Sequence, residues 1–281
     1  MSEIFSDKEK GGIIMDRTKK AWINGLFLII TLFINTLGAL GIVNGLSQKE
    51  VSDMYLTLIT PAPSAFRIWS VIYSLLILSI IVMIIKKDDS YYKNAIDNIT
   101  APFRISCIFN IAWIVAFSYV QIELSALLIL GFLISLLFIC IKLKEIQLGK
   151  RFLLPLTFGF YTGWLFIATV VNISALLVKL KLDSFVLTNE TWAIVMLVVA
   201  VILVFVALSK IRNAVFPLPV AWAYWGIYQF LKASEGFKGE FALLENVALV
   251  GIIFLVVMAA IQLYQNKFNL LPNKYDKNRM V

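Results

Sequence analysis

The sequence contains no histidine and only two cysteines, Cys107 and Cys140, each within an apolar run. Histidine is the commonest metal ligand, the usual axial ligand of haem and the usual general base, so its absence removes the most frequent metal and acid–base sites. Cysteines in apolar surroundings are expected to be reduced thiols that pack as small hydrophobic groups. No metal site and no catalytic residue are predicted.

Charge is also scarce. Charged residues make up 15% of the 281 residues and hydrophobic residues 60%, whereas a soluble domain has roughly 25% charged residues. Because so few charges could not cover a surface in water, a lipid bilayer is the predicted solvent. The net charge of +8 is scattered over short loops and tails. Nucleic-acid binding would need a clustered basic face with interleaved aromatic residues, so that class is excluded.

Long hydrophobic runs dominate what is present. A bilayer core takes about 20 apolar residues in helical form. The run near the N-terminus is longer than a signal-peptide core and is expected to be retained. The run that begins at Val215 is short and Pro217 and Pro219 interrupt its start, so an interfacial or re-entrant segment is the alternative to a span there. The predicted spans are Trp22–Val43, Phe66–Ile85, Phe103–Val120, Leu124–Ile141, Phe152–Val178, Trp192–Leu208, Val215–Leu231 and Leu243–Tyr264.

The loops between these runs differ in charge. With eight spans, most lysines and arginines fall on the side of the N-terminus, called side A here, and the opposite side is called side B. Side B holds only a few basic residues: Lys49, Lys179, Lys181, Lys232 and Lys238. Cytoplasmic loops carry the excess of basic residues, so both termini are predicted to be cytoplasmic. Residues 1–20 are predicted as a polar tail, with Met15 as an alternative start, and residues 266–281 as a basic tail.

Polar residues inside the spans are few, and none at a helix centre is Asp, Glu or Lys, which argues against an ion-coupled pump. Asn35, Asn110 and Asn172 lie within spans, as do three tryptophans that are too deep to be simple interfacial anchors: Trp69, Trp113 and Trp164. Depth in the bilayer follows from a rise of about 1.5 Å per residue. By this measure the second, third and fifth spans place Trp69, Asn110, Trp113 and Asn172 in the half nearer side B, and Trp164 lies deeper. If those spans are neighbours, they could line one aromatic cavity for a large, flat ligand. Interhelical hydrogen bonding and ordinary core packing are the alternatives.

Three segments resemble the TspO/MBR family of tryptophan-rich sensory proteins and translocator proteins. Residues 60–73 are similar to the start of the family's second helix, where prolines and an aromatic, here Phe66, precede a W-x-x-x-Y pair. That pair is Trp69 and Tyr73 in this chain. Asn110 and Trp113 match the N-x-x-W pattern of the third helix.

The fifth span carries the third match. Trp164, Ala168 and Asn172 reproduce the W-x-x-x-A-x-x-x-N spacing of the family's fifth helix, while Phe160 stands where short members carry proline. The resemblance implies an all-α integral membrane protein with a five-helix TspO-like bundle over residues 21–178. Residues 179–265 are then predicted to add about three transmembrane helices.

The resemblance also implies a function. A multi-pass protein of a bacterial cell membrane would bind a porphyrin or other tetrapyrrole, or a sterol-like molecule, in an intramembrane aromatic pocket and act as a sensor or carrier; no cofactor is obligatory. The loop 44–65, with Tyr55 and Pro61, is the expected lid. Arg67 at the side-B mouth is a candidate partner for tetrapyrrole carboxylates, and a snorkelling interfacial arginine is the alternative. The predicted ligand-binding residues are Phe66, Arg67, Trp69, Tyr73, Asn110, Trp113, Trp164 and Asn172.

Alternative functions remain open at this level. One is an enzyme that degrades porphyrin under light, and another is a transporter or scaffold without a tetrapyrrole ligand. A homodimer could use the small-residue face of Gly38, Gly41 and Gly45. Trp222, Trp225 and Tyr228 form one helical stripe that favours core packing, with a ligand wall or a dimer face as alternatives.

Overall fold

The computed structural model describes residues 2–181 and 188–274, and these residues form helices joined by short segments. The elements in chain order are α1 (Ser2–Ala39), α2 (Gln48–Met54), the 3-10 helix η1 (Pro63–Arg67), α3 (Ile68–Ile85), α4 (Ser90–Ser118), α5 (Ile122–Ile146), α6 (Leu153–Lys179), α7 (Asn189–Ile211), α8 (Pro217–Lys232) and α9 (Ala242–Gln265). The prediction of an all-α integral membrane protein is confirmed, because seven helices of the described residues are long and apolar enough to cross a membrane.

Five helices form a closed ring. Helix α1 packs against α3 and α4, α6 packs against α3 and α5, and α5 completes the ring against α4. Helices α4 and α5 form a tight hairpin, since only Tyr119, Val120 and Gln121 separate them. Val120 has a φ of 58° and so makes the tight reversal. The ring is the scaffold that holds the predicted site residues.

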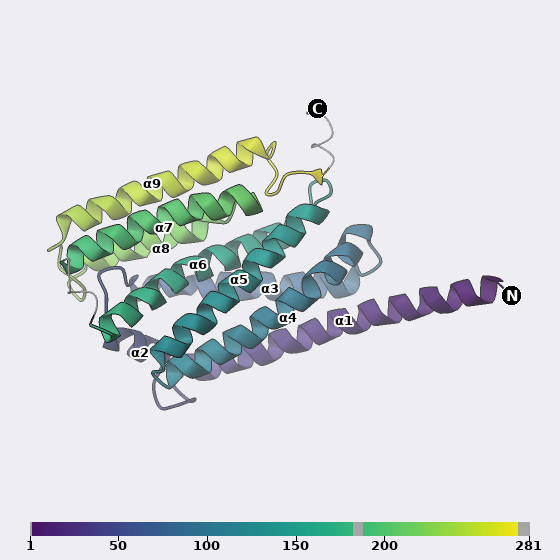
Figure 1. The fold of residues 1–281 in the computed structure, drawn as a ribbon, viewed down its shortest axis with the longest axis horizontal. Coiled ribbons are helices and arrows are strands. Elements are labelled where there is room, and N and C mark those ends of the chain that lie inside the picture. Colours follow the sequence, from purple (N-terminus) through teal and green to yellow (C-terminus); the bar gives the residue numbers. More distant parts are fainter. Residues whose placement is uncertain (1, 182–187, 275–281) are drawn as a thin grey trace.

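The other three helices form a layer against this ring. Helix α8 packs on α6 and η1, α9 packs on α8, and α7 packs on α9 and α5. Figure 1 shows α7, α8 and α9 side by side along one flank of the molecule. Helix α8 starts close to α6, where a Cβ on Gly163 would lie 2.2 Å from the carbonyl oxygen of Phe216. Only glycine fits at that contact.

Helix α8 is shorter than the predicted seventh span. It has 16 residues, which extend about 24 Å against the roughly 30 Å of a bilayer core. Pro217 stands in the first turn, where a missing N–H costs no helical hydrogen bond. The prolines therefore set the start of a short helix and do not prevent it. Helices α7 and α9 run in the same direction, and α8 joins the end of α7 to the start of α9. Although it is short, α8 therefore carries the chain back across the bundle (Figure 1).

Tails were predicted at both ends of the chain. Residues 2–20, predicted as a polar tail, are helical and belong to α1, whose first turns project beyond the bundle (Figure 1). A helix propagates more easily than it nucleates, and the apolar part of α1 provides the nucleus. The start of α1 and the end of α9 lie at the same end of the molecule (Figure 1). Residues 275–281 of the predicted basic tail lie outside the described residues.

Candidate ligand site

Five aromatic side chains from η1, α3 and α6 gather in one group, called the aromatic cluster: Phe66, Trp69, Tyr73, Tyr161 and Trp164. The rings of Trp69 and Tyr73 stack with centroids 5.1 Å apart, as their i, i+4 spacing on α3 allows. Trp69 meets Tyr161 and Trp164 edge-on, at 6.1 and 6.2 Å. Phe66 meets Trp164 edge-on at 5.7 Å. Four of the predicted site residues are thus brought together, with Tyr161 as the fifth ring.

A chain of hydrogen bonds fixes the two tyrosines of this cluster. The Tyr73 hydroxyl donates to Asn35 Oδ1 at 2.8 Å, and Asn35 Nδ2 donates to Asn110 Oδ1 at 2.9 Å. Asn110 Nδ2 then donates to the Tyr161 hydroxyl at 3.0 Å. Both asparagines are buried. This amide chain, Tyr73–Asn35–Asn110–Tyr161, links α3, α1, α4 and α6 and sets the direction of each ring.

Trp113 and Asn172 contact residues outside the aromatic cluster, namely Phe117 and Ser125. The Trp113 ring is tilted at 33° against Phe117 of the same helix, with centroids 5.8 Å apart. Phe117 packs with Val51 of α2 and Ala175 of α6, and Tyr55 covers this group. Asn172 Oδ1 accepts from the Ser125 hydroxyl at 3.2 Å. Among the described residues the ring contact of Trp113 is thus with Phe117, while its side chain belongs to the same buried core as Trp164.

The three spans that were expected to line one cavity are joined to one another in different ways. Helices α3 and α6 do pack together, but α1 packs between α3 and α4. The link from α4 to the aromatic cluster is made by the side chain of Asn110, through Asn35 and Tyr161. Spacing along each helix predicted which side chains face inward, and it could not tell which helix would stand beside which.

Two indole groups in these clusters lack a hydrogen-bond partner. Nε1 of Trp113 and Nε1 of Trp164 are both buried, and neither has an acceptor among the described residues. A buried donor left unpaired costs about 1–3 kcal/mol, and buried polar groups in proteins are nearly always paired. Each indole N–H is therefore available to an acceptor on a bound molecule. The N–H of Trp164 lies within the aromatic cluster, and that of Trp113 lies beside Phe117.

Arg67 lies beside these groups, at the end of η1. Its side chain is exposed, as is that of Phe66. The exposed position fits both interpretations of Arg67, a partner for ligand carboxylates and an interfacial cation. It lies one residue from the ring that covers Trp164.

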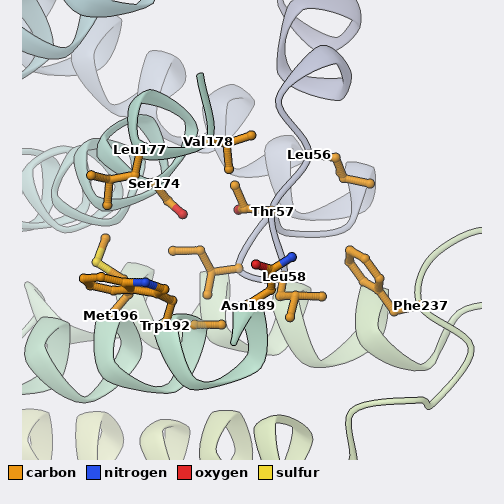
Figure 2. A pocket seen from close by; sticks show the side chains of 12 residues that line it. Leu56, Thr57, Leu58, Ser174, Leu177, Val178, Asn189, Trp192, Met196 and Phe237 are labelled. Atoms are coloured by element: carbon orange, nitrogen blue, oxygen red, sulfur yellow. The ribbon is translucent and has the colours of Figure 1, made fainter. Parts of the chain in front are cut away.

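A cavity of about 120 Å³ lies farther toward side B. Its walls come from the loop residues Leu56–Ile59, the end of α6, the start of α7 and Phe237. Figure 2 shows Trp192 and Met196 on one wall, with Ser174 and Thr57 across from them. None of the predicted site residues lines this cavity. Ligand pockets usually have 300–1,000 Å³, so this cavity is too small for a tetrapyrrole.

Comparison with known proteins bears on the same helices. The family model described as TSPO-like protein matches residues 21–261, which run from α1 into α9. The chain belongs to the TSPO-like protein family. The match continues through α7 and α8, which the sequence motifs did not reach. Neither the curated proteins nor the solved structures give a match.

Sequence reasoning missed two contacts around the aromatic cluster. Asn35 was visible as a polar residue within a span, but its place in the amide chain depends on three helices. Trp222 was expected to pack in the core, and its ring is 42% exposed with Nε1 donating to Ala65 O at 2.9 Å. No local pattern could have identified a partner 157 residues away.

Proposed function

We propose that this TSPO-like membrane protein binds a large, flat, apolar molecule of the tetrapyrrole or sterol-like class against the aromatic cluster, as a sensor or carrier. The observation that carries this proposal is the unpaired indole N–H of Trp164, which lies behind Phe66 and beside Trp69. Stacked rings supply the apolar contact area, and a single buried donor gives the ligand its orientation.

The closed arrangement sets a condition on binding. Phe66 covers Trp164 with its own ring, and the neighbouring cavity is smaller than a tetrapyrrole. Entry therefore requires η1 and the lid to move outward, so that the ligand takes the place of the Phe66 ring. After that movement Trp69 and Trp164 would stack on the ligand, and Trp113 and Asn172 would contact its far end under α2.

A fluorescence titration tests this proposal. Purified protein in detergent or nanodiscs is titrated with protoporphyrin IX while tryptophan emission is recorded, and a sterol is used as competitor. Wild type should show saturable quenching. Trp164→Phe and Trp113→Phe each remove an indole N–H but keep an aromatic ring, so Kd should rise roughly three- to tenfold. Trp225→Phe is the matched control, because Trp225 lies on α8 and pairs with Tyr228 instead.

The outcomes are distinct. Quenching that does not saturate, or equal Kd values for all three variants, would rule out the aromatic cluster as the binding site. No quenching by any tetrapyrrole and no sterol binding would favour a transporter or scaffold role.

Illumination separates a sensor or carrier from an enzyme. The complex with protoporphyrin IX is irradiated, and the Soret band is compared with that of porphyrin in empty nanodiscs. A sensor or carrier should leave the rate of bleaching unchanged. Faster bleaching in the presence of the protein, lost in Trp164→Phe, would instead support light-dependent degradation.

A further inference from the structure

Two main-chain groups of the lid are bound by helix α8. Nε1 of Trp222 donates to the carbonyl oxygen of Ala65 at 2.9 Å. The amide of Ala62 donates to the carbonyl oxygen of Gly226 at 3.0 Å. Trp222 and Gly226 are four residues apart, so they lie one turn apart on the same face of α8. The two bonds hold the lid at Ala62, just before η1, and at Ala65, within η1.

Close packing adds to these bonds. A Cβ on Gly226 would lie 2.7 Å from Ala65 Cβ and 3.1 Å from Pro61 Cβ. The absence of a side chain at this position is therefore what lets the lid reach α8. Pro61, Ala62 and Ala65 are all buried by the contact.

The exposed tryptophans of α8 show that the Trp222 bond is specific. Trp222 and Trp225 are 42% and 41% exposed, so neither ring is held by core packing alone. Trp225 lies against Tyr228 with centroids 5.5 Å apart, whereas Trp222 bonds the lid. An indole N–H that faces lipid without an acceptor would be costly, so this bond stabilises the closed position of the lid.

Helix α8 is itself firmly anchored. The Tyr224 hydroxyl donates to Leu197 O of α7 at 2.6 Å, and the Tyr224 ring lies so near Gly251 of α9 that a Cβ there would be at 2.6 Å. A lid bound to α8 is thus tied to all three helices of the outer layer.

The bound segment leads directly into the proposed ligand site. Ala65 is followed by Phe66, whose ring covers Trp164, and Trp69 is only one turn farther along. We infer that α8 holds the outer wall of the ligand site: Trp222 and Gly226 are positioning residues that keep residues 61–66 of the lid over the aromatic cluster, so that ligand exchange requires their release. The part about ligand exchange rests on the proposed function, whereas the hold on the lid does not.

Hydrogen exchange measured by mass spectrometry tests the hold without any ligand. The readout is the peptide that contains the amides of Ala62, Ala65 and Phe66. Trp222→Phe removes the donor to Ala65 and keeps an aromatic ring, so exchange in this peptide should become about fivefold faster. Gly226→Ala pushes the lid away from α8 and should accelerate hydrogen exchange in this peptide further. Trp225→Phe, with equal exposure on the same helix, should leave it unchanged.

Porphyrin kinetics complete the test. In stopped-flow mixing with protoporphyrin IX, Trp222→Phe should raise both the association and the dissociation rate several-fold, with a smaller change in Kd. A purely structural role would lower the melting temperature without accelerating both rates. Trp222→Phe is the milder change, so this variant alone tests the inference if Gly226→Ala does not fold.

Each result has one meaning. Unchanged exchange in the lid peptide of Trp222→Phe overturns the inference. Faster exchange with unchanged porphyrin rates also overturns it, because the held segment would not control the site. Faster exchange together with no porphyrin binding by wild type would contradict the proposed function and still support the hold of α8 on the lid.

Discussion

The Tyr73 hydroxyl and the Asn110 carboxamide sit on helices that α1 separates, and the single side chain of Asn35 joins them at 2.8 and 2.9 Å. Leucine has the same branching as asparagine with a somewhat larger volume, and in the buried place of Asn35 it leaves the Tyr73 hydroxyl without its acceptor and Asn110 Oδ1 without its donor. We expect Asn35→Leu to lower the free energy of unfolding by about 1–2 kcal/mol. Unfolding in mixed micelles, followed by circular dichroism, measures the change.

Two further variants serve as comparisons for the expected effect of Asn35→Leu on the free energy of unfolding. Tyr73→Phe leaves only one acceptor without its partner and should cost less than Asn35→Leu. Thr36→Val removes an exposed hydroxyl that bonds Leu32 O within α1, and it should have little effect. Equal effects of all three would mean that the amide chain adds nothing to packing.

Arg67 distinguishes the two kinds of ligand. If its guanidinium pairs with a tetrapyrrole carboxylate, Arg67→Gln should weaken binding of protoporphyrin IX by roughly three- to fivefold, because an exposed ion pair contributes at most about 1 kcal/mol. Binding of the dimethyl ester, which has no carboxylate, should not change. Both values come from quenching titrations at low ionic strength.

The same titrations at high salt provide the control. Salt should weaken binding of the diacid to wild type and have little effect on Arg67→Gln, because screening acts on exposed charges. An equal loss for diacid and ester would show that Arg67 acts through packing, as a snorkelling side chain does.

The helices and the inward-facing residues of this protein could be predicted from sequence, and their partners could not. Lipid requires long apolar runs and penalises unpaired polar groups, so spans and inward asparagines are readable locally. The i, i+4 spacing of Trp69 and Tyr73 puts both rings on one face of α3, where they stack. The place of α1 between α3 and α4 depends on packing of whole helices. The bond from Trp222 to Ala65 likewise depends on a layer whose position no short motif encodes.

Asp89 was another residue whose role depended on its partners. It looks like a solvated loop residue in the sequence, but it caps α4 by accepting from the amides of Tyr91 and Tyr92. It also pairs with Arg151 Nη2 at 2.9 Å. Partial burial raises the pKa of Asp89. The hydrogen bonds from the two amides and the charge of the Arg151 guanidinium lower it by more, so the net pKa of Asp89 is lowered.

A lowered pKa in the folded state has a definite consequence for stability. The contribution of Asp89 is complete above the pKa of an unfolded aspartate and is lost as the pH falls through the lowered folded value. Asp89→Ala should cost about 1 kcal/mol at neutral pH, as loss of an N-cap does. The difference in melting temperature from wild type should shrink in acid. Asp88→Asn, at the exposed neighbouring position, should show no such trend.

The helix of the lid offers a second way to loosen it. Helix α2 has only seven residues and starts with a capping box, in which Ser47 Oγ accepts from the Glu50 amide and the Glu50 carboxylate accepts from the Ser47 amide. So short a helix does not form alone. Ser47→Ala should therefore remove about 1 kcal/mol of local stability, seen as roughly fivefold faster hydrogen exchange at residues 50–55.

Asp53→Asn is the control within α2, because it breaks only the exposed ion pair with Lys49, which contributes little. Val51 of α2 packs on Phe117 beside Trp113, whereas residues 61–66 are held by α8. Ser47→Ala should accordingly speed exchange in α2 and leave the Ala62 amide unchanged, and Trp222→Phe should do the reverse. If either variant loosened both segments equally, the lid would move as one unit, and α8 would hold α2 as well as η1.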